Sequence, residues 1–224
     1  MSDTKPIVIG LSGFYGSGKD TLAEQIVEQD PSFVHMSFAD PVLDIARASH
    51  PDQLLWNRES WDTLKQDAAN RNFVVNLGES IRDTLGSEVF ALNVVDRIYE
   101  AQDRGQNVVI SDVRLPVEHY NLRKHFDDEF TNYRLAIVDS PLQDLRLSRM
   151  NVSHLRFSHH ATFYSAHRIS AFRDSVLSAF ILFRSANDLL RLARGTLDEE
   201  TQDWHTAAVL DYRKRYYHLA DSEA

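Results

Sequence analysis

A cluster of glycines near the start of the chain constrains its fold more than any other feature of the sequence. Residues 13–19 read G-F-Y-G-S-G-K, and four of the eight glycines lie between Gly10 and Gly18. The spacing G-x-x-x-x-G-K is that of the phosphate-binding loop, in which glycines let backbone N–H groups turn inward around an anion. The lysine then reaches the β- and γ-phosphates of a nucleoside triphosphate. An apolar run at residues 7–11 precedes the loop and a helical pattern follows it, which is the context that the motif requires.

The residue after the lysine departs from the usual motif. Asp20 stands where a serine or threonine normally ligates Mg²⁺, and Thr21 comes next. A carboxylate is also a hard oxygen ligand for Mg²⁺, but an acid is equally favoured in the first turn of a helix. The sequence leaves both interpretations of Asp20 open. The residues that we expect to contact ATP are Gly13, Tyr15, Gly16, Ser17, Gly18, Lys19, Asp20 and Thr21.

Apolar runs and helical patterns alternate along the first two thirds of the chain. This order predicts βαβ units, and therefore a parallel sheet with helices on both faces, the α/β fold of P-loop proteins. We expect strands at residues 7–11, 33–36, 107–111 and 135–138, and helices at 42–48, 77–99 with breaks, and 117–126.

The last third of the chain has a different pattern. Residues 144–217 contain no convincing strand, and Phe172, Val176, Phe180 and Phe183 recur at helical spacing. A second helical stretch ends at Gly195. We interpret residues 1–224 as a single domain, with a core at 1–144, a candidate lid at about 145–173 and C-terminal helices at about 174–224.

An acid follows the apolar strand at residues 107–111. In P-loop proteins an Asp at the end of such a strand holds Mg²⁺, so Asp112 joins Asp20 as a candidate metal ligand. Arg114 would lie at the same sheet edge, where its guanidinium could bind a substrate phosphate through two parallel hydrogen bonds. The alternative is a structural Asp–Arg pair. Glu118 and Arg123 lie on the next helix, and we expect both on the solvated surface.

Four segments together resemble a known family. They are G-S-G-K-D-T at residues 16–21, F-A-D-P at 38–41, I-R-D-T-L-G at 81–86 and S-D-V-R-L-P-V-E at 111–118. This series resembles the bacteriophage-type deoxynucleoside monophosphate kinases, which belong to the P-loop nucleoside-monophosphate-kinase-like group. The resemblance covers about residues 5–140.

The resemblance implies an activity and a second substrate site. It implies ATP·Mg²⁺ at the glycine loop, a nucleoside monophosphate beside residues 38–41, and transfer of the γ-phosphoryl group between them. We further expect the Phe38 ring to stack on the base. The residues expected to bind the acceptor are Phe38, Ala39, Asp40, Arg82, Asp112 and Arg114, and Lys19 and Arg114 are expected to act in catalysis.

Residues 145–173 form a basic segment. They include five arginines and four histidines, while all 33 acidic residues of the chain lie elsewhere. We interpret the segment as a lid whose arginines, Arg149 and Arg156 first, stabilise the transferring phosphoryl group. An exposed helical surface and a nucleic-acid patch are the alternatives. A metal site built from these histidines alone is disfavoured, because no carboxylate or cysteine lies near them in the sequence.

Composition narrows the classes of function further. The net charge of −9 argues against a general nucleic-acid binder, and the absence of cysteine excludes disulfides and thiolate chemistry. No apolar run is long enough to span a bilayer and no secretory signal is visible, so we expect a cytoplasmic protein with small-molecule substrates. A homodimer is compatible with the sequence. The alternative functions are a kinase of another phosphorylated metabolite, of the dephospho-coenzyme A or phosphomevalonate type, and a nucleotide-sensing protein without transfer activity.

Overall fold

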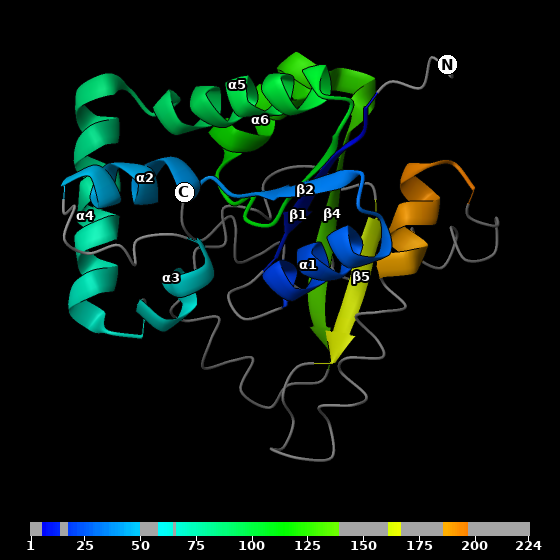
Figure 1. Cartoon of the computed structure of the whole chain (residues 1–224), viewed down its shortest axis with the longest axis horizontal. Helices are drawn as coiled ribbons and strands as arrows, with labels where there is room; N and C mark the ends of the chain where they lie inside the picture. Colours follow the sequence, from blue (N-terminus) through cyan, green and yellow to red (C-terminus); the bar gives the residue numbers. More distant parts are fainter. Residues whose placement is uncertain are drawn as a thin grey trace.

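Five parallel strands form one sheet (Figure 1). The computed structural model describes residues 6–13, 18–49, 58–64, 66–138, 161–166 and 186–196. The sheet order is β2-β3-β1-β4-β5, and every neighbouring pair runs parallel. The strands are β1 (Val8–Ser12), β2 (Phe33–Met36), β3 (Asn107–Ile110), β4 (Phe130–Val138) and β5 (Ala161–Ala166). The predicted α/β class with a parallel sheet is therefore confirmed.

Helices cover both faces of this sheet. On one face lie α5 (Val89–Asp103) and α6 (Pro116–Phe126), and on the other lie α1 (Lys19–Gln29) and a helical stretch at residues 186–193 (Figure 1). A short 3₁₀ turn, η1 (Asp127–Glu129), links α6 to β4. Beyond the β2 edge stand α2 (Asp40–Ser49), α3 (Arg58–Leu64) and α4 (Ala68–Leu85).

The central strands are buried on both sides. Ile9 of β1 and Val109 of β3 pack with α1 and residues 186–190, whereas Val8 and Val108 pack with α5 and α6. Successive side chains of a strand point to opposite faces, so a strand covered on both faces needs an unbroken apolar run. The same run is what made β1 and β3 recognisable in the sequence. A third apolar cluster joins α2, α4 and α5.

Several predicted elements have different bounds in the structure. The fourth strand begins at Phe130 and not at Leu135. The helical region at 77–99 is two helices, which separate at Gly86, where φ is 100°. Helix α3 was not predicted at all. In the last third, residues 189–193 are helical and Gly195 follows with φ 66°, as expected.

The prediction that residues 144–217 hold no strand is wrong. Residues Ala161–Ala166 form β5, which pairs with β4 along its whole length. These six residues lie inside the candidate lid, and a strand hydrogen-bonded into the sheet is not free to swing over a substrate. The rest of that segment, residues 145–160 and 167–173, lies outside the described residues. Within the described part of the chain, no helix has the length and apolar character to cross a membrane.

Candidate active site

Two glycines with positive φ bound the loop between β1 and α1. Gly13 has φ 144°, and Gly18, which precedes the first residue of α1, has φ 88° and ψ 21°. A side chain is disfavoured at both angles, so the glycines at these positions are required by the backbone path. The loop delivers Lys19 to the start of α1, whose N-terminus favours an anion. Tyr15, Gly16 and Ser17 lie outside the described residues.

Asp20 is linked to the neighbouring strand. Ser111, directly after β3 and 1% exposed, donates its hydroxyl to Asp20 Oδ1 at 2.6 Å. Asp20 itself is exposed in the first turn of α1, and so is Thr21. The described hydrogen bond of Asp20 therefore runs across the sheet edge and not to its own helix. This arrangement orients one carboxylate oxygen and leaves the group accessible.

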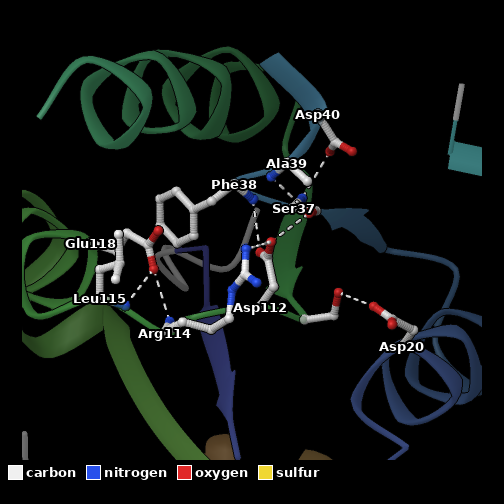
Figure 2. Close-up of polar contacts among 10 residues, drawn as sticks. Asp20, Ser37, Phe38, Ala39, Asp40, Asp112, Arg114, Leu115 and Glu118 are labelled. Atoms are coloured by element: carbon white, nitrogen blue, oxygen red, sulfur yellow. Dashed lines mark hydrogen bonds and ion pairs between the residues drawn. The ribbon is translucent and has the colours of Figure 1, made fainter. Parts of the chain in front are cut away.

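Asp112 connects the end of β3 to the start of α2. Its Oδ1 accepts a hydrogen bond from the backbone N–H of Phe38 at 2.7 Å, and its Oδ2 accepts one from the Ser37 hydroxyl at 2.8 Å (Figure 2). Arg114 approaches the same Oδ2 at 3.8 Å, with its side chain 53% exposed. An ion pair this long and exposed contributes little stability. Asp112 thus mainly links the end of β3 to residues 37 and 38 through hydrogen bonds. The Arg114 side chain faces solvent beside it.

The predicted stacking of Phe38 on a base is wrong. Its side chain is 2% exposed and packs in the core with α5, α6 and the central strands. The ring was expected to be available to a base, but the turn that carries it is bound to Asp112 directly after β3, and the side chain packs inward. What Phe38 contributes at the site is its backbone N–H, which Asp112 holds.

Ser37 and Asp40 form the start of α2. Asp40 Oδ2 accepts from the Ser37 N–H at 2.8 Å, and the Ser37 hydroxyl accepts from the Ala39 N–H at 3.0 Å. This pattern resembles a helix-capping box, although the hydroxyl accepts from the second residue after it and not from the third. It accounts for the carboxylate of Asp40 as part of the helix start, while Ala39 lies half-buried in the turn.

Arg82 lies beside the first turn of α2, although it comes from α4. Its guanidinium is 5.1 Å from the centre of the Phe90 ring, a cation–π contact. A Cβ placed on Gly78 would lie 3.7 Å from both Arg82 Nη1 and Val42 Cγ2. Arg82 and Val42, a residue of the first turn of α2, therefore both lie near Gly78.

Glu118, expected on the surface, is buried. Its side chain is 4% exposed, and Oε2 accepts from the backbone N–H groups of Arg114 and Leu115, each at 2.8 Å (Figure 2). Burial, with a smaller contribution from the charge of Asp112, raises the pKa of Glu118 to about 7 against the opposing effects of Arg114 and the two N–H groups. The sequence carried a signal: an acid two residues after a proline that opens a helix occupies the capping-box position.

Sequence reasoning missed Ser37, Ser111 and Glu118 as members of this site. The structure brings Gly13, Gly18, Lys19 and Asp20 to one side of it, and Phe38, Ala39, Asp40, Asp112 and Arg114 to the other. The catalytic candidates Arg149 and Arg156 lie outside the described residues. A surface hollow of about 510 Å³ at the turn between α4 and α5 includes none of the predicted site residues.

The donor set at this edge fits Mg²⁺ bound together with a nucleotide. Among the described residues, no three His, Cys, Asp or Glu side chains gather into a metal cage. Mg²⁺ does not need one, because it usually keeps several waters and binds one or two carboxylates plus substrate phosphates. Asp20, exposed at the helix start with one oxygen fixed by Ser111, offers such a carboxylate.

Comparison with known proteins adds little to this geometry. No family model matches the chain, and a search of curated proteins finds no match. Among solved structures, an unliganded sugar kinase from Janibacter sp. HTCC2649 is similar at 13% identity and a TM-score of 0.38, over 87% of this chain and 99% of that one. A gluconokinase from Sinorhizobium meliloti 1021 is similar at 17% identity and a TM-score of 0.31, over 83% and 97%. Such scores carry no argument about activity, and the resemblance to phage kinases stays a prediction.

Proposed function

We propose that this protein is a kinase that transfers the γ-phosphoryl group of ATP to a nucleoside or deoxynucleoside monophosphate. The observation that carries the proposal is the set of three hydrogen bonds made by two adjacent residues after β3. Ser111 bonds to Asp20 at the glycine loop, and Asp112 bonds to Ser37 and Phe38 at the start of α2. One short turn therefore holds a triphosphate-binding motif and the predicted acceptor segment at the same sheet edge, where ligands of open α/β folds bind.

On the ATP side, the glycine loop and the start of α1 receive the phosphates. Lys19 adds a positive charge toward the β- and γ-phosphates. Asp20, oriented by Ser111, would hold Mg²⁺, which when bound would offset negative charge on the phosphate oxygens. Asp112 retains lone pairs beyond its two hydrogen bonds, so it can contribute to the metal through a bound water.

On the acceptor side, Arg114 lies 3.8 Å from Asp112, which bonds to Ser37 and Phe38. Arg82 of α4 lies near Gly78, as does Val42 of α2. An oxygen of the acceptor phosphate attacks the γ-phosphorus in line, the bond to the β–γ bridging oxygen breaks, and ADP leaves with that oxygen. No covalent enzyme intermediate is needed. Catalysis of this kind consists of positioning and charge neutralisation, which is what a lysine, a metal-binding carboxylate and arginines supply.

The test is a panel of all nucleoside and deoxynucleoside monophosphates, with dephospho-coenzyme A and phosphomevalonate included, each incubated with ATP and Mg²⁺ and scored for ADP release. One or a few monophosphates should stimulate ADP release, and Lys19→Ala should abolish the stimulation. If only dephospho-coenzyme A or phosphomevalonate stimulates ADP release, the phosphoryl acceptor is a metabolite of that type and not a nucleoside monophosphate. ATP binding without stimulation by any acceptor would instead support a nucleotide-sensing protein.

A further inference from the structure

We propose that Glu118 is a positioning residue that sets the direction of Arg114 toward the acceptor phosphate. The inference rests on the proposed function, because it takes Arg114 as the acceptor-binding arginine. Glu118 itself is placed one step away from the substrate. It acts on the backbone of the turn from which Arg114 projects.

The hydrogen bonds explain how a buried acid can aim an exposed arginine. A single oxygen, Oε2 of Glu118, accepts from two consecutive N–H groups, those of Arg114 and Leu115. Two adjacent peptide planes directed at one oxygen leave the Arg114 backbone little freedom to rotate. The Arg114 side chain is 53% exposed and its ion pair with Asp112 is long, so its own contacts restrain it weakly. The fixed backbone is therefore what gives Arg114 a defined direction.

The chemistry of Glu118 also exceeds what a helix start requires. An exposed serine or aspartate before α6 would satisfy helix N–H groups without a buried charge. Here the acid is 4% exposed, and the negative charge of Asp112 opposes its ionisation. A buried acid beside a second acid is costly and tends to occur where function needs it. The competing interpretation is a helix cap with no influence on Arg114.

Two variants distinguish the role of the Glu118 oxygen, which accepts the two hydrogen bonds, from the role of the Glu118 charge. Glu118→Gln keeps a side-chain oxygen at the same reach and loses the charge. Glu118→Asp keeps the charge and withdraws the oxygen by one methylene. Asn121→Ala is the matched control, because Asn121 is 1% exposed on the same helix and its described hydrogen bond goes to Val117. Each protein is titrated calorimetrically with the nucleoside and deoxynucleoside monophosphates and with ATP, and amide exchange is followed by NMR.

The expected result is a split between the variants. Glu118→Asp should weaken monophosphate binding by roughly 10- to 100-fold, the scale of a small misplacement of a catalytic group, with ATP binding unchanged. The Arg114 and Leu115 amides should lose exchange protection in that variant. Glu118→Gln should keep near-native monophosphate binding and amide protection, and Asn121→Ala should leave monophosphate binding unchanged. In an Arg114→Ala background, Glu118→Asp should cause no further loss of monophosphate affinity.

Two failures are distinguishable. If wild-type protein binds ATP but none of the monophosphates, the proposed acceptor is wrong and this inference falls with it. If wild-type protein binds a monophosphate and Glu118→Asp binds it equally well, only the inference is overturned. Loss of monophosphate binding or of amide protection in Glu118→Gln also overturns it, and this outcome can be read even if Glu118→Asp does not fold. A further loss on top of Arg114→Ala would show that Glu118 does not act through Arg114.

Discussion

The two turns that meet at the carboxyl edge of the sheet are held in different ways. The glycine loop between β1 and α1 is shaped by its own backbone, with Gly13 and Gly18 at positive φ. The turn between β3 and α6 is shaped by side chains: Ser111 bonds to Asp20, Asp112 to Ser37 and Phe38, and Glu118 to its own turn. A loop built from local conformation can be recognised in a sequence, whereas one built from distant partners cannot. Substitutions in each turn therefore test how that turn is held.

The largest effect is expected at Lys19, where the loop meets the triphosphate. Lys19→Ala should lower the rate of phosphoryl transfer by on the order of a thousandfold, because a positioned charge on the reacting phosphates is lost. Lys124→Ala, an exposed lysine on α6, is the control and should retain wild-type turnover. Circular dichroism should be native for both variants. A folded Lys19→Ala enzyme with near-normal turnover would remove the glycine loop from the reaction.

In the β3–α6 turn, the largest effect should be a pH dependence of stability from Glu118. The pKa of Glu118 is about 7 in the folded protein against an ordinary value of 4.5, so the folded protein binds this proton more tightly than the unfolded chain. Below pH 4.5 Glu118 is protonated and neutral in both the folded and the unfolded protein, so no charge is buried on folding. Between pH 4.5 and 7 stability should fall as pH rises, by about 3 kcal/mol in total, and the loss is complete above pH 7.

Glu118→Gln isolates this contribution. Urea unfolding of both proteins at several pH values should show a difference in unfolding free energy that moves in favour of the variant as pH rises through this window. The two sequences differ only at residue 118, so the pH-dependent difference reports the loss of the Glu118 carboxyl. Two stability curves that run parallel from pH 4 to 8 would contradict a raised pKa at this position.

The contrast between the turns also explains how much the sequence could predict. Strands β1 and β3 and helix α1 were found because each has a local apolar pattern that burial on both faces or on one face demands. The loop was found because its glycines are a local requirement of its path. The fold class followed from these elements alone.

What was missed depends on partners far away in the chain. Strand β5 is an edge strand, and its six residues carry no local pattern that predicts pairing with β4. The helical pattern around it therefore led to the prediction that residues 144–217 hold no strand. The Phe38 ring could not be placed in the core without knowing that its turn crosses the end of β3. The hydrogen bond between Ser111 and Asp20 joins residues 91 apart in the sequence, so no local pattern predicts it. Glu118 is the exception, since its capping position was visible and only its burial was not.

A smaller effect is expected when Asp112 is changed. Asp112→Ala removes hydrogen bonds to Ser37 and Phe38 from one carboxylate that is 15% exposed, and should lower the unfolding free energy by about 2–3 kcal/mol. Asp112→Asn keeps one oxygen for the Phe38 N–H and can donate its amide to the Ser37 hydroxyl, so its loss should be smaller, about 1 kcal/mol. Denaturant unfolding measures both.

The same pair of variants tests the proposed link of Asp112 to the metal. Asp112→Asn should raise the Mg²⁺ concentration needed for half-maximal activity, and Mn²⁺ binding followed by electron paramagnetic resonance should weaken in parallel. Unchanged Mn²⁺ affinity in a folded Asp112→Asn protein would mean that Asp112 does not bind the metal and only links the end of β3 to residues 37 and 38. Asp20 would then stand as the carboxylate ligand proposed for this site.

The smallest effect is expected from a single methyl group at Gly18, and it tests whether the glycine loop is held by its backbone. At φ 88° an alanine is strained by about 1–2 kcal/mol, which corresponds to roughly a tenfold change in affinity if the loop shifts to relieve it. Gly105→Ala is the matched control: Gly105 has φ 72°, and an added Cβ there meets nothing within 4 Å. Both variants should unfold at lower urea concentration, but only Gly18→Ala should bind ATP more weakly. Equal ATP affinity in the two variants, with both destabilised, would mean that the strained glycine serves folding alone and that the loop does not depend on it to receive phosphate.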